Sequence, residues 1–303
     1  MAPRSPKKQP RSARAGRGPA PGALRELRKA GAFAKKSLGQ HFLIDQRTLR
    51  RIAQAAALSA DDTVIEIGAG LGDLTAQLAE RAGRVIAIEL DEKLAEHLRR
   101  RFDGTNVFVL EGDALAIDPA EALAKAGATP PYIVVGNLPY NVAQPLLRHF
   151  LETQTKPERL VVMVQAEVAE SITARPGKLS ILGLSVQLYG EPELLFRVPA
   201  SAFYPPPKVQ SAVVRIDVAR ELRAQVADVA AFFELVRAGF GTRRKQLRNA
   251  IANGLGIDTM TAGAVLSRAG IRYTLRAQEL TLEQWAALAR AWTQLGLAVQ
   301  LHG

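Results

Sequence analysis

The tetrapeptide Asn137-Leu138-Pro139-Tyr140 contains the residue types needed to act on an amine attached to an aromatic ring. Such an amine is planar and weakly nucleophilic, because its lone pair is delocalised into the ring. Two carbonyl acceptors that draw its N–H groups out of the ring plane would turn the lone pair toward an electrophile. The Asn137 side chain and a nearby backbone carbonyl are candidates for these two acceptors. Pro139 fixes its own φ and restricts Leu138 toward extended geometry, which would hold that carbonyl in place. Tyr140 offers a flat face for a base removed from its stack.

A glycine loop, Gly68-Ala-Gly70-Leu-Gly72, follows Glu66 and could hold the electrophile. Glu89 lies 21 residues after Gly68, where an acid would hydrogen-bond the hydroxyls of a ribose. Asp73 takes the place of the third glycine of a dinucleotide fingerprint, and no histidine is placed to handle hydride, so a nicotinamide cofactor is disfavoured. S-adenosyl-L-methionine, a nucleoside without phosphates, fits the loop better. Its sulfonium carries its own leaving group, so methyl transfer would need orientation rather than a metal or a strong base.

The elements that must position these residues recur regularly. Glu66, Glu89, Asp113 and Asn137 are separated by 23, 24 and 24 residues, and β-branched runs accompany them at 64–67, 84–90, 106–110 and 132–135. Helical patterns at 71–82, 91–102 and 118–127 separate the runs. This alternation predicts a doubly wound, Rossmann-like α/β sheet whose ligands bind beyond the carboxyl ends of its strands.

Structural explanations exist for each polar residue taken alone. A role as a helix cap or turn residue would explain the presence of any one of the four polar residues, and it explains Asp113 best. A rigid Asn-x-Pro turn beside a core tyrosine would explain residues 137–140. The shared spacing favours a single cofactor cleft.

The composition excludes several classes of protein. The chain has 303 residues, enough for two domains, and no cysteine, which excludes disulfides, thiolate nucleophiles and cysteine-ligated metals. Its 4 histidines are scattered, so we expect no metal site, and no apolar stretch is long enough to span a membrane. The formal net charge of +11 indicates a polyanionic partner.

The charge is unevenly distributed along the chain. Residues 1–36 hold 11 basic and 1 acidic groups, residues 37–218 hold 18 and 22, and residues 219–303 hold 11 and 6. The first 34 residues combine this charge with prolines and glycines, which predicts a disordered basic arm. A nucleic-acid-binding arm is favoured over a transit peptide or a tail without function, and the absence of an apolar segment disfavours a secretory signal.

Residues 219–303 change to helical patterning and are predicted to form a smaller, all-helical domain, with a capping box at Thr281 and Gln284. Four cations stand close together in it, at Arg243, Arg244, Lys245 and Arg248. They are predicted to contact RNA phosphates, although a solvated basic face is an equally good explanation. Because residues 37–218 are net acidic, this part and the arm would have to hold the RNA.

Six motifs together resemble the ribosomal RNA adenine N6-dimethyltransferase family: KKSLGQHFLID (35–45), VIEIGAGLGDLT (64–75), AIELD (87–91), EGDAL (111–115), GNLPYNVAQPLL (136–147) and SAFYPPPKVQSAVVR (201–215). The resemblance runs from about residue 35 to the C-terminus. It implies an S-adenosylmethionine-dependent enzyme that methylates N6 of two adjacent adenosines near the 3′ end of small-subunit (16S) rRNA, with a role in small-subunit biogenesis.

The resemblance also implies roles for particular residues. Tyr140 and Phe203 would sandwich the target adenine, and Pro205–Pro207 would form a stiff bend that aims Phe203. Position 41 is His where bacterial members usually carry Asn; we expect its imidazole to be neutral beside a bound sulfonium. The residues implied in contact with the methyl donor, with Glu66 orienting the loop, are His41, Leu43, Glu66, Gly68, Gly70, Glu89, Asp113 and Asn137.

The family resemblance favours one architecture and leaves two other functions open. It implies a methyltransferase domain at 35–218, whose remaining strands and connections lie at 161–172, 184–198 and 209–218. The arm at 1–34 lies outside the resemblance and is predicted from composition alone, and the charge and helical patterning of 219–303 predict a helical RNA-binding domain. We expect a cytoplasmic monomer that binds rRNA or immature small subunits. The alternatives are a large-subunit rRNA methyltransferase giving macrolide resistance, and a mainly non-enzymatic RNA- or DNA-binding assembly or transcription factor.

Overall fold

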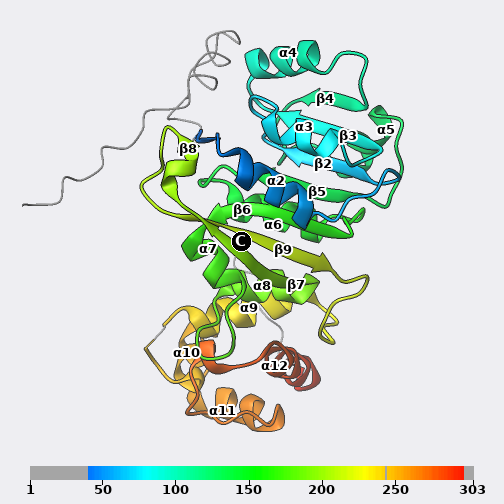
Figure 1. Ribbon diagram of the computed structural model, residues 1–303. Coiled ribbons are helices and arrows are strands. Elements are labelled where there is room, and N and C mark those ends of the chain that lie inside the picture. Colours follow the sequence, from blue (N-terminus) through cyan, green and yellow to red (C-terminus); the bar gives the residue numbers. More distant parts are fainter. Residues whose placement is uncertain (1–39, 243, 297–303) are drawn as a thin grey trace, which may run out of the picture.

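The computed structural model describes residues 40–242 and 244–296, so the predicted arm at 1–34 and Arg243 lie outside the described residues. Figure 1 shows a twisted sheet with helices on both faces and, below it, a smaller group of helices, here called the helical lobe. Within these ranges no helix is long and apolar enough to cross a membrane.

Seven strands form the main sheet, in the order β4-β3-β2-β5-β6-β9-β7. The first five strands of that order are parallel, and β9 and β7 are antiparallel to their neighbours. The order reverses between β2 and β5, which is where doubly wound sheets bind ligands. The strands are β2 (Thr63–Ile67), β3 (Arg84–Glu89), β4 (Val107–Glu111), β5 (Ile133–Asn137), β6 (Arg159–Gln165), β7 (Gly190–Val198) and β9 (Ser211–Val218). The predicted α/β fold and its four parallel strands are confirmed.

The helices cover the two faces of the sheet because successive strand residues point to opposite sides. Val64 packs in a cluster with Leu49 and Leu78, whereas its neighbour Ile65 packs in the cluster that contains Leu123 and Leu146. One face is covered by α2 (Gln46–Ala55), α3 (Asp73–Ala79) and α4 (Glu92–Arg101). The other is covered by α5 (Pro119–Lys125), α6 (Ala143–Glu152), α7 (Ala166–Ile172) and α8 (Ile181–Tyr189).

One helix differs from the expectation for the second half of the chain. Residues 184–198 were expected among strands and connections, but residues 181–189 form α8 and only Gly190–Val198 is a strand. Leu184, Val186 and Leu188 are all fully buried. A helix buried on nearly every side shows no polar face, so its apolar run cannot be distinguished from a buried strand by periodicity.

The helical lobe consists of α9 (Val229–Phe240), α10 (Leu247–Leu255), α11 (Thr259–Arg268), the short 3₁₀ helix η3 (Ala277–Glu279) and α12 (Leu282–Gln294). Trp285 is fully buried and stacks on Phe240 at 5.8 Å between ring centres. The predicted capping box is confirmed: the Gln284 N–H donates to Thr281 Oγ1 at 3.2 Å, and the Thr281 N–H donates to Gln284 Oε1 at 2.9 Å. Trp285 belongs to the same core cluster as Ile65, so the lobe and the sheet share one core.

Candidate active site

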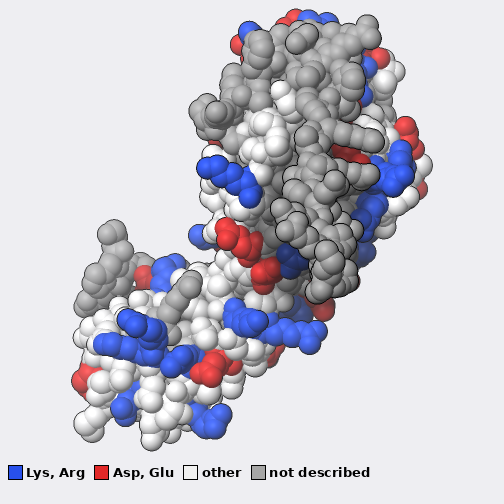
Figure 2. Space-filling model, turned by 60° about the vertical axis from the view of Figure 1, so that its left-hand side comes forward, with Lys and Arg blue, Asp and Glu red and all other residues white. Residues whose placement is uncertain are grey.

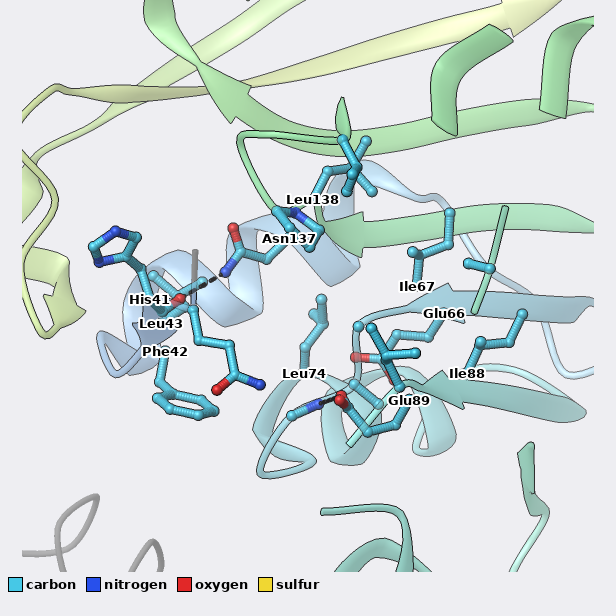
Figure 3. Close-up of a pocket in the computed structure, with 18 of the residues that line it drawn as sticks. His41, Phe42, Leu43, Glu66, Ile67, Leu74, Ile88, Glu89, Asn137 and Leu138 are labelled. Atoms are coloured by element: carbon cyan, nitrogen blue, oxygen red, sulfur yellow. Dashed lines mark hydrogen bonds between the residues drawn. The ribbon is translucent and has the colours of Figure 1, made fainter. Parts of the chain in front are cut away.

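A pocket of about 300 Å³ opens at the carboxyl ends of β2, β3 and β5 (Figure 3). The sheet order brings these strand ends together, and the two-stranded pairing of β1 (Phe42–Leu43) with β8 (Phe203–Tyr204) lies beside them. All but one of the residues predicted to bind the donor or the base line this pocket, namely His41, Leu43, Glu66, Gly68, Gly70, Glu89, Asp113, Asn137, Leu138, Pro139 and Tyr140.

The glycine loop forms one wall of the pocket through backbone conformations that other residues rarely adopt. Gly68 and Gly70 have φ values of +70° and +58°. This geometry aims the Gly70 N–H at the Glu89 carboxylate, to which it donates at 2.8 Å. The loop thereby binds the end of the neighbouring strand, and α3 begins directly after it at Asp73.

Glu89 is held in place by two backbone donors. Oε2 accepts from Gly70 and Oε1 accepts from the Asp91 N–H at 3.0 Å. Burial raises the pKa of this carboxyl, and the two backbone hydrogen bonds oppose that shift. Each oxygen keeps a second lone pair, so the oriented carboxylate can accept hydroxyl groups of a bound ribose.

Glu66 presents a buried carboxyl with an unfilled hydrogen-bonding position. The side chain is 1% exposed, and Oε2 has no hydrogen-bond partner among the described residues. Burial, with a smaller contribution from the Glu89 charge, raises the pKa of Glu66 to about 8. A buried polar atom without a partner is costly, and a cationic or N–H group of a ligand would relieve that cost. The pocket therefore fits a nucleoside with a positively charged or amine-bearing tail.

Asn137 is oriented by the backbone of His41. Its Nδ2 donates to the His41 carbonyl at 3.0 Å, and because a carbonyl can only accept, the amide nitrogen must face it (Figure 3). The side-chain oxygen Oδ1 is therefore left as an acceptor. Asn137 is the last residue of β5 rather than the residue after it, so the sheet itself fixes its position.

Tyr140 is held at its hydroxyl and at its ring. The hydroxyl lies 2.6 Å from Ser211 Oγ at the start of β9, and Ser211 is fully buried. The ring stacks against His41 at 5.6 Å between centres and 28° between planes. His41 Nδ1 lies 2.7 Å from the Pro205 carbonyl and must donate to it. Residue 41 thus touches both Asn137 and Tyr140.

Phe203 does not line the pocket. It is 3% exposed and packs in the core cluster that contains Leu43 and Leu49, because the β1–β8 pairing places Phe203 opposite Leu43. The structure therefore does not bring Tyr140 and Phe203 together as two sides of a base-sized gap. Asp113 does line the pocket, but it is exposed and caps a turn, accepting from the Leu115 N–H at 2.9 Å.

Leu90 and Ser211 are among the residues at this site that sequence reasoning missed. Leu90 lines the pocket and is 52% exposed, and its position directly after Glu89 at a strand end was the available signal. Ser211 carries no such signal, since it lies 71 residues from Tyr140 and meets it only through the fold.

The predicted RNA contacts lie away from this pocket. Arg244 and Lys245 precede α10 and Arg248 lies in its first turn, within the helical lobe (Figure 1). Arg243 is outside the described residues. Phosphate binding by these residues stays a prediction.

The fold and the strand-end pocket define a Rossmann-like methyltransferase. The family model described as "Ribosomal RNA adenine dimethylase" matches residues 31–294. The chain therefore belongs to the ribosomal RNA adenine dimethylase family and is an rRNA methyltransferase by that membership.

Similar proteins agree with this assignment. The chain is 48% identical over 262 residues to "Ribosomal RNA small subunit methyltransferase A" of Dehalococcoides mccartyi, covering 86% of this chain and 89% of the relative. The identity to the protein of the same name from Desulfitobacterium hafniense is 42%, covering 88% and 95%. Among solved structures, a dimethyladenosine transferase from Plasmodium falciparum superposes with a TM-score of 0.72 at 25% identity, and the 23S rRNA methyltransferase ErmE with 0.65 at 29%. These two alignments cover 86% and 84% of this chain, and all of each structure.

Proposed function

We propose that this enzyme transfers methyl groups from S-adenosyl-L-methionine to N6 of two adjacent adenosines near the 3′ end of small-subunit rRNA. The observation that carries the proposal is the orientation of Asn137: its nitrogen is occupied by the His41 carbonyl, so its oxygen is the group free to accept an amine N–H. The relatives named for the small subunit are 40–49% identical, against 29% for the ErmE structure, and this supports small-subunit rRNA as the substrate.

The residues of the pocket support binding of the donor. When bound, S-adenosylmethionine supplies an electrophilic methyl group on a sulfonium. In our proposal Glu89 accepts the ribose hydroxyls, the Gly68–Gly70 loop lets backbone approach the ligand, and Leu43 and Leu90 supply apolar contact. The unpartnered Glu66 oxygen receives an N–H of the donor's amino-acid end.

The proposed mechanism at the amine depends on orientation. Asn137 Oδ1 and a backbone carbonyl of the 137–140 segment each accept one N–H of the adenine amine, which turns its lone pair toward the methyl group. Tyr140 supports the plane of the base, and its fixed ring limits the directions of approach. Phe203 would have to leave the core to complete a sandwich. The extra proton leaves to solvent after transfer, so no strong base is required.

The remaining expectations follow from family membership and charge. We infer that residues 35–218 bind the donor and the base, that residues 219–303 hold RNA with the basic arm, and that a cytoplasmic monomer acts on immature small subunits. A mainly non-enzymatic role is disfavoured because the pocket residues needed for transfer are present together.

The test is incubation of the protein and labelled donor with unmethylated small subunits and, in parallel, large subunits, followed by mapping of the modified nucleosides. We expect label at N6 of two adjacent adenosines in small-subunit rRNA. Label only in large subunits would favour the macrolide-resistance alternative, and no label in either would favour the non-enzymatic one.

A further inference from the structure

Tyr273 is an exposed aromatic side chain on the helical lobe, in the segment between α11 and η3. It is 52% exposed. This segment runs beside the start of α10, where the Leu247 N–H donates to the Leu275 carbonyl at 2.7 Å. The hydrogen bond brings the 270–276 segment next to the cations that precede and begin α10.

Arg248 covers one face of the Tyr273 ring. Its guanidinium carbon lies 5.2 Å from the ring centre, within the range of a cation–π contact. Its aliphatic stem lies near Gly263 of α11, where a built Cβ would meet Arg248 Cδ at 3.7 Å. Arg248 Nε is buried without a hydrogen-bond partner in the described part of the chain. Packing therefore holds the guanidinium in place, and Arg248 forms no ion pair with a residue that the structure describes.

Further cations lie in the two chain segments that meet here, at Arg244 and Lys245 before α10 and at Arg272 directly before Tyr273. Arg244, Lys245 and Arg272 are exposed, and none of the three forms an ion pair with any residue in 40–242 or 244–296. Figure 2 shows Lys and Arg side chains gathered over the lower, helical part of the molecule. An aromatic face within a field of free cations is the combination that binds single-stranded nucleic acid, since bases stack on the ring while phosphates contact the cations.

We propose that Tyr273, backed by Arg248, is a stacking platform for an unpaired base of the RNA substrate, with flanking phosphates against Arg244, Lys245 and Arg272. The proposal rests on the proposed function and deepens it, because it assigns recognition of an unpaired nucleotide outside the pocket that takes the target adenine. A duplex hides its base faces within the stack, so the platform selects unpaired RNA over paired RNA. An acidic protein partner would match the cations but would not depend on an accessible base.

The experiment compares full-length wild type, Tyr273→Ala, Tyr273→Phe and Met260→Ala in binding a single-stranded oligoadenylate and a fully paired RNA duplex of the same length, across a salt series. Met260 is a matched control because it is 84% exposed, apolar and in the same lobe. The Tyr273→Ala variant should bind the single strand about tenfold more weakly than wild type, because it loses the stacking of one base. Its salt slope should stay unchanged, because no phosphate contact is removed. Tyr273→Phe keeps the ring and should bind like wild type, as should Met260→Ala, and duplex binding should be equal in all four.

Equal binding of the single strand by wild type and Tyr273→Ala, or an equal loss for strand and duplex, would overturn the platform. So would a wild-type protein that does not bind the single strand. The methyl-transfer assay on small subunits separates this outcome from the proposed function: Tyr273→Ala should raise KM for subunits and keep kcat. If wild type transfers no methyl group, the proposed function fails, while the oligonucleotide measurements still decide on the platform.

Discussion

The Tyr140 hydroxyl is bound to a buried serine, in addition to the stacking of its ring on His41. The Tyr140 hydroxyl and Ser211 Oγ lie 2.6 Å apart; Ser211 is fully buried and Tyr140 is half-buried. Ser211→Ala should slow single-turnover methyl transfer about fivefold, the equivalent of one hydrogen bond near 1 kcal/mol. Tyr140→Phe removes the same bond from the other side, so the double variant should be no slower than the slower single one. Effects that simply add would show that the two residues act separately, provided donor affinity is unchanged in each.

Glu66 makes stability depend on pH with a definite sign. Its pKa is about 8 in the folded protein, against 4.5 for an unperturbed glutamate. Between these values the folded state keeps a proton that the unfolded state releases, so the free energy of unfolding falls as pH rises from 4.5 to 8. Glu66→Gln has no such proton. Its stability relative to wild type should increase by on the order of 2 kcal/mol between pH 6 and pH 8, measured by denaturant unfolding. A difference that does not change with pH would contradict a buried, protonated Glu66.

At the level of single residues, the sequence predicted which residue types form the pocket, but it did not predict which of them contact one another. The types and spacing of Glu89, Asn137 and Tyr140 were sufficient to place them at one pocket. The burial of Phe203 was not predictable, because it follows from a two-residue strand pairing with a segment 160 residues away in sequence. Ser211 was missed for the same reason: a contact between distant segments exists only after folding.

At the level of elements, the glycine loop is fixed by both backbone conformation and space. Gly72 has a φ of +83°, and a built Cβ would meet Leu98 and Phe102 side-chain carbons at 2.7 Å. Gly104 has a similar φ of +72° but nothing within 4 Å of the built Cβ. Gly104→Ala should therefore cost only the left-handed strain, about 1 kcal/mol. Gly72→Ala should cost that plus the overlap, roughly 2–4 kcal/mol in all. Equal losses of thermal stability in the two variants would show that packing against α4 does not constrain the loop.

Helices whose sequence alternates buried apolar and exposed polar positions could be predicted, whereas a helix buried on nearly every side could not. The helix at Glu92–Arg101 has buried positions at Leu94, Ala95 and Leu98 and polar residues between them, so its stripe is visible in the sequence. The helix at Ile181–Tyr189 has no such stripe, because it lies between the sheet and the helical lobe.

Across the whole molecule, charge and chemistry occupy different regions. The pocket lies at the sheet, whose part of the chain is net acidic, and the free cations lie on the helical lobe. Reversing Arg244 and Lys245, which are both exposed, to Glu should weaken RNA binding and reduce its salt slope, because fewer phosphate contacts form and fewer counterions are released on binding. Donor affinity should not change. The matched control reverses Arg99 and Arg100, which are exposed in the last turn of α4. If both double variants lose the same affinity and slope, binding reflects net charge and not this surface.

The central claim is that Asn137, turned by the His41 carbonyl, offers its side-chain oxygen to the amine that is methylated. The most direct measurement is the single-turnover rate of methyl transfer to unmethylated small subunits by Asn137→Ala, with donor and subunits both saturating. We expect the rate to fall at least about 100-fold, as for loss of a group that acts in the transition state, while subunit affinity stays within a few-fold of wild type. A rate close to that of wild type would contradict the account.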